Sequence, residues 1–577
     1  MKNSLVSVFA GFWAITGFSQ TYITDVTLAD VEKHRMLPGK TVVINGTVIT
    51  DVKSGKVPIP VGATVIDGSG KFLMPGMTDA HVHFFQNGGL YARPDAIDLR
   101  YLMPYDKEIK SSHDNFTPAL RRYLANGITT VIDPGATYHF LKHKQELAGQ
   151  TQAATVLMSG PLLTTYLPEV YKDLGDDAPF HLVQTPDDAR KMVREQLAHK
   201  PDFIKIWYIA NGEGKDMEAT ARKYLPVVQA IIDESHKNNI KVAVHATELF
   251  TATLSAESGC DYLVHSVEDQ LIPDSFVQLL KKKKVVLCPT LVVSDGYEDT
   301  FGQKLNISNH DLRMADPHQM GSLLDLKHLA DTALVNAYRK YTVSDKQLKR
   351  VLEANSICMK NLKKLADGGV TIATGTDAGN IGTLHASSYL DEILRMREAG
   401  LSNWQILEAS TLGGAKVLGK QQSLGSIAKG KKADLVLLDA DPSANIENVT
   451  KINKVIHNGV VLQPEKLLVE TPEQLVQRQL NAYNFRNIEA FLDTYADDVE
   501  VYTFPEKLDF KGKETMRKIY ADMFLKTPNL HCELKGRIVR GNIVIDNEHV
   551  TFGSGSIDGV AIYHVENGKI KKVYFLP

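Results

Sequence analysis

Short apolar runs alternate with longer amphipathic stretches over residues 71–419. Eight of the runs have the length and composition of buried strands, and helical spacing of apolar residues marks the stretches that follow them. Examples of the runs are FLMPGMTDAHVH, ITTVIDPG, FIKIW and TIATGTDAG. Strands that alternate with helices indicate a parallel α/β fold, and eight such units predict a (β/α)8 TIM barrel.

The pattern changes near the C-terminal end, where residues 471–577 begin with helical spacing and continue as several alternating strands. Thr471 and Gln474 have the spacing of a capping box, which predicts a helix start. Helices followed by a run of strands are typical of an α+β unit. We therefore expect a separately folding C-terminal domain.

Residues 1–19 have the form of a secretory signal peptide. Lys2 precedes a 14-residue apolar run, Leu5–Phe18, which is short for a membrane span. Small residues, Gly17 and Ser19, stand before the expected cleavage point. The interpretation implies a secreted or periplasmic protein with no membrane attachment after cleavage. A buried N-terminal helix or an uncleaved anchor are the alternatives.

Amino-acid composition and net charge exclude several classes of protein. Hydrophobic residues make up 43% and charged residues 23% of 577, which is ordinary for a folded soluble domain. Lysine and arginine number 65 against 68 acidic residues, so the net charge is 65 − 68 = −3. This near-neutral balance argues against a nucleic-acid partner. Four cysteines are too few for a disulfide framework in a chain of this length.

Six ionisable side chains fall at the ends of predicted barrel strands, where this fold places its chemistry. They belong to the first, fourth, fifth, sixth and eighth strands: His81, His83, Lys205, His245, His265 and Asp377. Imidazoles and carboxylates suit zinc and similar ions, and two such ions about 3.5–4 Å apart can share one hydroxide. Asp377 could accept the proton of the attacking water and pass it to the leaving group. The set therefore predicts a catalytic metal centre.

Each of these residues taken alone has a simpler explanation. A single histidine in a strand is most often a satisfied core residue, and Asp377 in GTDAG could cap a turn. Lys205 could be half of a buried salt bridge, since a lysine inside FIKIW is costly unless paired or neutralised. The metal interpretation depends on the six occurring together, in strand order.

These residues resemble the amidohydrolase superfamily. LMPGMTDAHVHFF is similar to its first-strand motif, and GTDAG to its eighth-strand aspartate motif. The spacings of 40 from Lys205 to His245 and 20 from His245 to His265 resemble the imidazolonepropionase-like branch. That branch includes Xaa-Pro dipeptidases and N-acyl amino acid amidases. Imidazolonepropionase itself is a poorer match, because it resembles a one-metal design without the bridging lysine.

The resemblance implies two divalent metal ions, with zinc expected. His81, His83 and Asp377 would hold the more buried ion, and His245 and His265 the second. Lys205 would be N6-carboxylated and bridge both ions. Carboxylation needs a neutral amine, and burial beside cations lowers the pKa of a lysine, so the chemistry is consistent.

The resemblance also implies the remaining domains. Residues 20–70 and 420–465 would form a composite β-sandwich domain beside the barrel. Residues 471–577 resemble the nuclear-transport-factor-2-like (SnoaL-like) fold, a cone of helices against a curved sheet. Domains of this fold act in dimerisation or ligand binding, so the resemblance allows a homo-oligomer that forms through the C-terminal domain. Asp509, His531 and Glu548 are expected at its surface.

The expected activity is hydrolysis of an amide bond, in a dipeptide or an N-acyl amino acid, by a metal-bridging hydroxide. The substrate is a small molecule, contacted by four loop residues: Tyr208, His385, Tyr138 and Arg93. Residues 292–345 are a candidate lid over the site. Two alternatives stay open: a lactonase or phosphotriesterase-like esterase on the same metal centre, and a non-catalytic ligand-binding protein.

Overall fold

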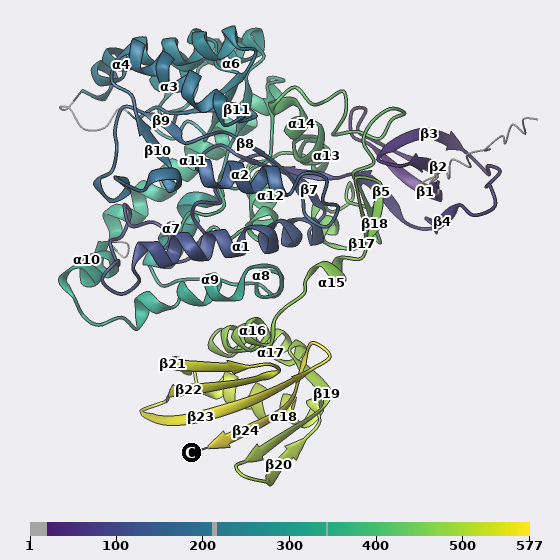
Figure 1. Cartoon of the computed structure of the whole chain (residues 1–577), viewed down its shortest axis with the longest axis vertical. Helices are drawn as coiled ribbons and strands as arrows, with labels where there is room; N and C mark the ends of the chain where they lie inside the picture. Colours follow the sequence, from purple (N-terminus) through teal and green to yellow (C-terminus); the bar gives the residue numbers. More distant parts are fainter. Residues whose placement is uncertain (1–19, 210–215, 342–343, 577) are drawn as a thin grey trace, which may run out of the picture.

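The structure is a computed structural model that describes residues 20–209, 216–341 and 344–576. The predicted signal peptide lies outside the described residues. The chain forms a mixed α/β part, a sheet that projects from its side, and a C-terminal sheet unit (Figure 1). Within the described ranges, each helix is too short or too polar to cross a bilayer.

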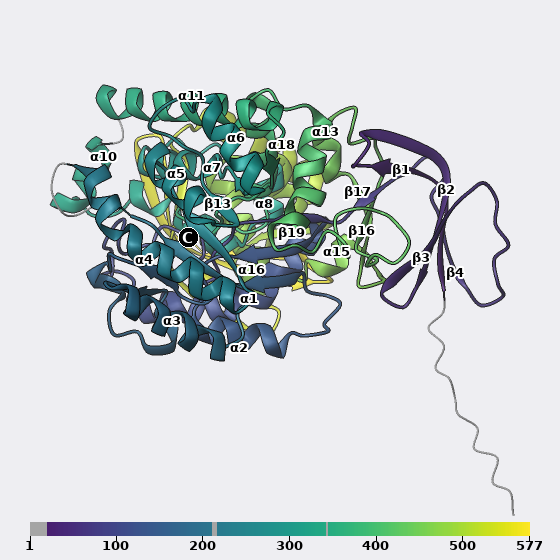
Figure 2. The ribbon, with the colours of Figure 1, turned by 90° about the horizontal axis from the view of Figure 1, so that it is seen from above.

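The projecting sheet joins the two segments that flank the α/β part. Its eight strands are β1 (Thr21–Asp30), β2 (Arg35–Asn45), β3 (Val48–Ser54), β4 (Thr64–Asp67), β5 (Phe72–Pro75), β16 (Leu435–Leu438), β17 (Ile452–His457) and β18 (Val460–Leu462). β5 pairs with β16 in antiparallel fashion, which brings the two flanking segments together. β1 to β4 lie to one side of the molecule when it is seen from above (Figure 2).

The α/β part is built on parallel strands in two sheets. The first is β6 (Met77–Asp79), β7 (Ile128–Asp133) and β8 (Thr155–Met158); the second, in spatial order, is β10 (Phe180–Leu182), β9 (Leu162–Thr164), β11 (Phe203–Trp207), β12 (Lys241–His245), β13 (Tyr262–Val264), β14 (Val286–Cys288) and β15 (Thr371–Ile372). Isolated parallel bridges, Ser159 to Phe203 and Val82 to Ala378, connect the two sheets at both junctions. Strands β9 and β10 were not expected, because three residues are too few to show a strand period.

Amphipathic helices follow these strands, as the sequence pattern predicts. They are α1 (Tyr105–Ala125), α2 (Tyr138–Glu146), α3 (Pro186–Ala198), α4 (Met217–Lys237), α5 (Leu249–Ser258), α6 (Asp274–Lys283), α11 (Asp345–Asp367), α12 (Ser388–Glu398), α13 (Asn403–Glu408) and α14 (Gly414–Val417). Local chemistry sets their ends. Thr185 caps α3 by accepting a hydrogen bond from the Asp188 N–H, and α5 stops at Gly259, whose φ of 97° suits glycine.

An excursion between β14 and α11 carries four more helices: α7 (Val292–Phe301), α8 (Asn309–Met314), α9 (Pro317–Ser322) and α10 (Ala333–Tyr341). α8 and α9 pack against the first long helix of the C-terminal unit, α16 (Pro472–Asn484). Leu312 and Met320 share an apolar cluster with Leu475. The Asn481 side chain donates to the Pro317 carbonyl at 2.6 Å. The excursion therefore joins the α/β part to the C-terminal unit.

The C-terminal unit packs helices on one sheet. The helices are α15 (Pro464–Leu467) in the connection, then α16, α17 (Ile488–Asp493) and α18 (Lys513–Lys526); the strands, in spatial order, are β20 (Lys507–Lys511), β19 (Tyr495–Thr503), β24 (Lys569–Leu576), β23 (Gly555–Glu566), β22 (Ile543–Phe552) and β21 (His531–Arg540). The capping box of Thr471 and Gln474 is present at the start of α16.

Candidate metal centre

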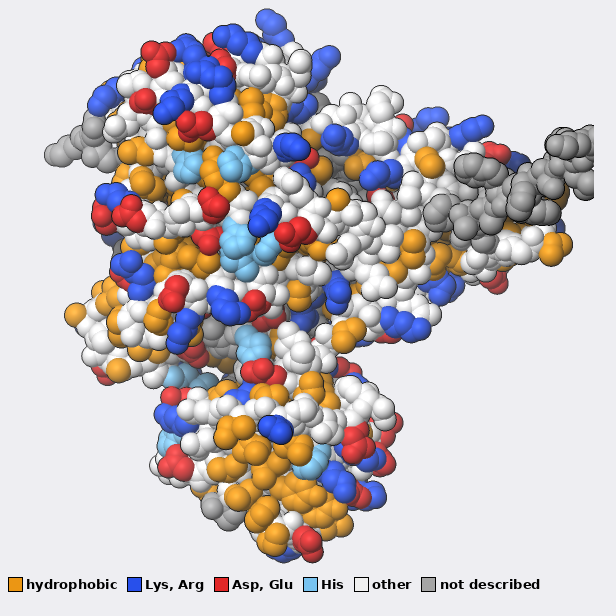
Figure 3. Space-filling view, viewed as in Figure 1, with side chains coloured by type: hydrophobic (Ala, Val, Ile, Leu, Met, Phe, Trp, Pro, Cys, Tyr) orange, Lys and Arg blue, Asp and Glu red, His pale blue; other side chains and the backbone are white. Residues whose placement is uncertain are grey.

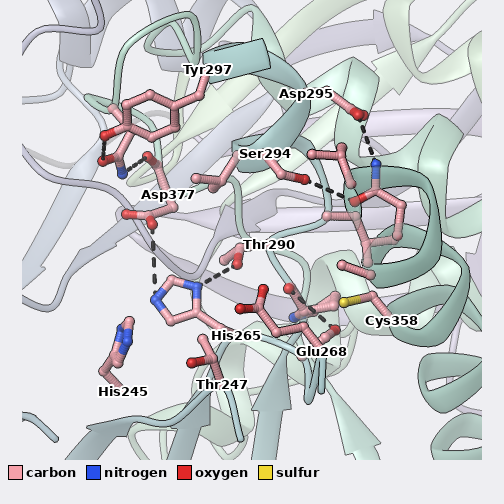
Figure 4. Close-up of a pocket in the computed structure, with 18 of the residues that line it drawn as sticks. His245, Thr247, His265, Glu268, Thr290, Ser294, Asp295, Tyr297, Cys358 and Asp377 are labelled. Atoms are coloured by element: carbon pink, nitrogen blue, oxygen red, sulfur yellow. Dashed lines mark hydrogen bonds and ion pairs between the residues drawn. The ribbon is translucent and has the colours of Figure 1, made fainter. Parts of the chain in front are cut away.

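The C-terminal ends of five parallel strands bring the six predicted ligands together. His81 and His83 follow β6, Lys205 lies in β11 and His245 ends β12; His265 follows β13 and Asp377 follows β15. All but His81, which is fully buried behind them, line one cavity of about 810 Å³. Figure 4 shows the side chains of His245, His265 and Asp377 around a common space.

The closest polar atoms in this group are ring nitrogens and a carboxylate oxygen that face one another. Asp377 Oδ1 lies 3.3 Å from His81 Nε2 and 3.2 Å from His83 Nε2, and the two Nε2 atoms are 3.1 Å apart. His265 Nε2 lies 3.9 Å from Asp377 Oδ2. Asp377 Oδ1 is buried with no hydrogen-bond partner among the described residues. Nitrogen and carboxylate atoms that converge in this way fit a divalent cation such as zinc.

The second half of the group lies beside the first. The rings of His245 and His265 meet edge to face with centroids 4.4 Å apart, and His81 is 5.0 Å from His265 by the same measure. Lys205 is 1% exposed in the same cavity, and its charge lowers the pKa values of both His81 and His245. Lys205 therefore influences the pKa of a histidine in each half of the group.

Burial prepares most of these groups in the form that binds a metal. It lowers the pKa of His81 and His245 well below the usual value, and that of His265 to about 4, so all three are neutral at pH 7. Burial also lowers the pKa of Lys205 to about 7, which makes the neutral amine accessible. His83 differs, because hydrogen bonds with carboxylates outweigh burial and raise its pKa.

Asp377 is held as an anion in spite of its burial. Burial alone would raise its pKa, but the close approach of His83 first, and then of His265 and Lys205, lowers it. The backbone at Asp377 has a φ of 58°, and φ is 79° at His265 and 48° at Thr290. Side chains other than glycine rarely adopt this conformation, and such strain often gathers at functional sites.

Three supporting residues were missed by the sequence interpretation. Thr290 Oγ1 is 2.7 Å from His265 Nδ1 and orients that ring. Asp79 accepts hydrogen bonds from the N–H and hydroxyl of Thr376 at 3.0 and 2.8 Å, tying β6 to the eighth strand end. Asp133 Oδ1 lies 3.5 Å from His83 Nδ1. An acidic residue that ends an apolar run such as ITTVID is a signal that could have found Asp133.

Arg93 is the one of the four predicted substrate contacts that reaches the cavity wall. Its guanidinium forms a bidentate pair with Asp95, with Nε to Oδ1 at 2.7 Å and Nη2 to Oδ2 at 2.6 Å. It also donates to Asn380, which accepts from the Tyr297 hydroxyl at 2.9 Å (Figure 4). Arg93 is therefore a fixed cation at the edge of the metal-ligand group.

The other three point elsewhere, so their prediction as substrate contacts is wrong for this geometry. Tyr208 donates its hydroxyl to the Ala221 carbonyl at 2.5 Å, because strand alternation turns it away from the face of Lys205. His385 is half-buried and lies between the Tyr123 hydroxyl, at 3.2 Å, and the Gln86 carbonyl, at 3.1 Å. Tyr138 stacks on the His199 ring with centroids 3.7 Å apart.

The excursion supplies one wall of the cavity through α7. Ser294, Asp295 and Tyr297 line it from this helix, and Trp207 and Phe180 lie on the wall beside Lys205 with ring centroids 4.8 Å apart. The predicted lid segment therefore contacts the cavity through its first helix, whereas α8 and α9 contact the C-terminal unit.

The C-terminal unit contains a second cavity, of about 400 Å³, lined mainly by aromatic and aliphatic side chains. Glu548 lies in it and is 9% exposed, so the expected surface position of this residue is wrong. The Tyr563 hydroxyl donates to the Glu548 carboxyl group at 3.0 Å. Burial raises the pKa of Glu548 to about 7. Asp509 is exposed as expected, and His531 stacks on His328 of the excursion at 3.6 Å. Figure 3 shows hydrophobic side chains gathered on one face of this unit.

Two family models match the chain. The amidohydrolase family matches residues 72–462, and the SnoaL-like domain matches residues 476–573. The first match covers well over half of the sequence and includes all six converging residues. The chain belongs to the amidohydrolase family, a family of hydrolases that act on carbon–nitrogen bonds. Both resemblances drawn from the sequence motifs are confirmed.

Individual relatives place the chain among several enzymes of this family. Imidazolonepropionase of Salinispora tropica is 37% identical over 102 residues, which is 17% of this chain and 26% of that enzyme. The match therefore spans about a quarter of the relative's length. Imidazolonepropionase of Brevibacillus brevis is 26% identical over 432 residues, 70% of this chain and 84% of that enzyme.

The comparison with solved structures concerns the fold. A prolidase crystallised with N-methylphosphonate-L-proline has a TM-score of 0.58 at 22% identity, over 77% of this chain and 100% of that one. At this identity the likeness establishes a shared fold.

Proposed function

We propose that the chain is a metal-dependent amidohydrolase that cleaves the amide bond of a dipeptide or an N-acyl amino acid. The parallel strands would close into a (β/α)8 barrel, which the bridges at both sheet junctions support. The observation that carries the proposal is the convergence of the six ionisable residues, five of which line one cavity while buried His81 contacts Asp377 and His83. Residues 1–19 would direct the protein to a secreted or periplasmic location.

The donor set fits two divalent ions, with zinc as the expected metal. One would be held by His81, His83 and Asp377, and the other by His245 and His265. Lys205, carboxylated at Nζ, would bridge them. When bound, the ions would polarise the substrate carbonyl and activate water. The lowered pKa of Lys205 supports carboxylation, because about half of the amine is neutral near pH 7.

Asp377 is the proposed proton carrier. It is anionic because His83 lowers its pKa, so its carboxylate can accept a proton from the attacking water. The protonated acid would then donate to the leaving nitrogen, which departs as a neutral amine. The cavity supports this by keeping Asp377 about 5% exposed, so that bulk water does not compete for the proton.

Arg93 favours a substrate that carries a carboxylate beside its amide bond. The pair with Asp95 fixes the guanidinium, and a fixed planar donor recognises a carboxylate with little loss of entropy. Trp207, Phe180 and Tyr297 provide apolar wall for a side chain or ring. A prolidase among the fold neighbours is consistent with a dipeptide of this kind.

The test is a substrate panel on the metal-loaded chain: Xaa-Pro dipeptides, N-acyl amino acids, their C-terminal amides, lactones and a phosphotriester. Hydrolysis of the free acids is expected. Arg93→Lys should raise KM for the acids about tenfold and leave KM for the C-terminal amides unchanged. If the chain hydrolyses only the lactones or only the phosphotriester, the protein is an esterase of that kind and the amidase proposal is wrong. If the chain hydrolyses none of these substrates and binds no metal, the proposal that it is an enzyme is wrong.

A further inference from the structure

A second group of histidines lies outside the cavity, on α1 and α2. His113 comes from α1, and His139 and His143 lie one turn apart on α2. Ring centroids are 4.1 Å apart for His113 and His139, 5.2 Å for His113 and His143, and 4.9 Å for His139 and His143. Figure 3 shows histidine side chains gathered on the face over these two helices. We refer to these three residues as the α1–α2 histidine cluster.

The ligand atoms of the cluster have metal-site spacing. One nitrogen from each ring lies within 4.8 Å of the others. Asp177 adds an oxygen to the group, because its Oδ1 is 2.7 Å from His113 Nε2 and 3.3 Å from His139 Nδ1. Ligands bound to zinc at 2.0–2.1 Å in a tetrahedron are about 3.3 Å apart. The three imidazoles are somewhat more open than this, and the carboxylate lies beside two of them, so a small closure of the rings would complete a four-ligand site.

Ordinary hydrogen bonding does not account for the whole cluster. Asp177 pairs with His113 and His139, whereas the partly exposed His143 is held in the cluster by contacts with the other two rings. His113 Nδ1 is buried and has no partner in the described part of the chain.

We propose that the α1–α2 histidine cluster and Asp177 bind a structural divalent ion, zinc by ligand type, separate from the centre in the cavity. The proposal does not depend on the activity, because it uses none of the cavity residues. An i, i+4 histidine pair on one helix face is a rigid chelate, and a third histidine from a neighbouring helix would cross-link α1 to α2.

The ion would also fix a loop that supports the cavity. Asp177 ends a short 3-10 turn, Gly175–Asp177, in the connection between β9 and β10. The same connection carries Tyr171, which is 1% exposed and donates its hydroxyl to Asp95 Oδ1 at 2.5 Å. Asp95 in turn holds Arg93 on the cavity wall. The cluster is therefore a positioning device for Arg93, through Asp177 and Tyr171.

The experiment measures zinc bound by the full chain after equilibration with free zinc ions. The variant is His139→Gln/His143→Gln, chosen because His139 is 41% exposed at its side chain and His143 is also partly exposed. The control is His318→Gln, a histidine on the surface of α9. We expect the double variant to bind one equivalent of zinc fewer than the wild-type chain, and the control to match the wild type. Equal zinc content in all three would overturn the proposal.

A second measurement separates loss of the ion from misfolding. In wild-type chain, zinc should slow hydrogen exchange in peptides that cover residues 169–179 about tenfold. The double variant should show no zinc effect there, while peptides from β22 and β23 exchange as in the wild type. Equal zinc protection of residues 169–179 in the variant would reject the site. Lys205→Ala should keep this ion, so failure of the cavity centre and failure of this site are distinguishable.

Discussion

The two cavities each bury a carboxylic acid, and they shift its pKa in opposite directions. Asp377 is 5% exposed and Glu548 is 9% exposed, so burial is similar. Asp377 has a lowered pKa because His83, His265 and Lys205 surround it. Glu548 has a pKa raised to about 7, by burial and then by the like charge of Asp546. The comparison teaches that the neighbours of a buried acid, more than its depth, decide whether it is an anion.

Replacing the buried acid by its amide in each cavity should give the largest difference between the two cavities, measured as kcat. Asp377→Asn is expected to lower kcat by about 10²–10⁴-fold or more, since it removes the proton acceptor, while much of the metal stays bound. Glu548→Gln is the matched control and should leave kcat within about twofold. Initial rates and metal content on both variants decide this. Full activity of Asp377→Asn would remove the aspartate from the mechanism.

Removing the lysine from the metal-ligand cavity should lower the metal content of the chain. Lys205→Ala is expected to lose at least one equivalent of metal from the cavity, because the bridging ligand is gone. Short-chain carboxylic acids such as acetate or propionate should restore part of it by occupying the vacated space. Lys241→Ala removes a half-exposed lysine in the next strand and is the control. Wild-type metal content in Lys205→Ala would refute the bridging role.

The raised pKa of Glu548 predicts how the stability of the C-terminal unit changes with pH. Between the ordinary pKa of 4.5 and the folded value of about 7, the folded state keeps a proton that the unfolded state releases. The stabilisation is therefore complete below pH 4.5 and falls by at most about 3 kcal/mol as the pH rises to 7.

Opening free energies of β22 and β23 from hydrogen exchange, corrected for the intrinsic effect of pH, measure this fall. Glu548→Gln should flatten the slope, because an amide does not titrate in this range. Glu566→Gln, which alters an exposed acid of β23, should keep it. An unchanged slope in Glu548→Gln would assign the pH dependence to other groups.

The convergence of the six ionisable residues could be predicted from the sequence because strand order alone positions them, whereas their role as metal ligands stays a prediction. Parallel strands end at the same edge, so His81, Lys205, His245 and Asp377 had to be near one another once the strands were identified. The helices and the capping box of the C-terminal unit follow from local patterns in the same way. The domain limits given for the flanking segments stay predictions.

Residues whose direction depends on side-chain packing were harder to predict. Alternation along FIKIW could have excluded Tyr208, because Lys205 and Trp207 share one face and the next residue takes the other. Nothing local shows that His385 is enclosed between Tyr123 and Gln86. Likewise, the spacing of His139 and His143 is visible in the sequence, but the approach of His113 from another helix is a property of the packed fold.

The excursion that carries α7, α8 and α9 has a consequence for how this chain can change. The C-terminal unit packs on α8 and α9, so it could be gained or lost without altering the pairing of any strand in the two parallel sheets. Loss would expose Leu312 and Met320 to water, and a shortened relative would be expected to carry polar residues there. The same helices wall the cavity through α7, so a graft at this place also adjusts the shape of the substrate site.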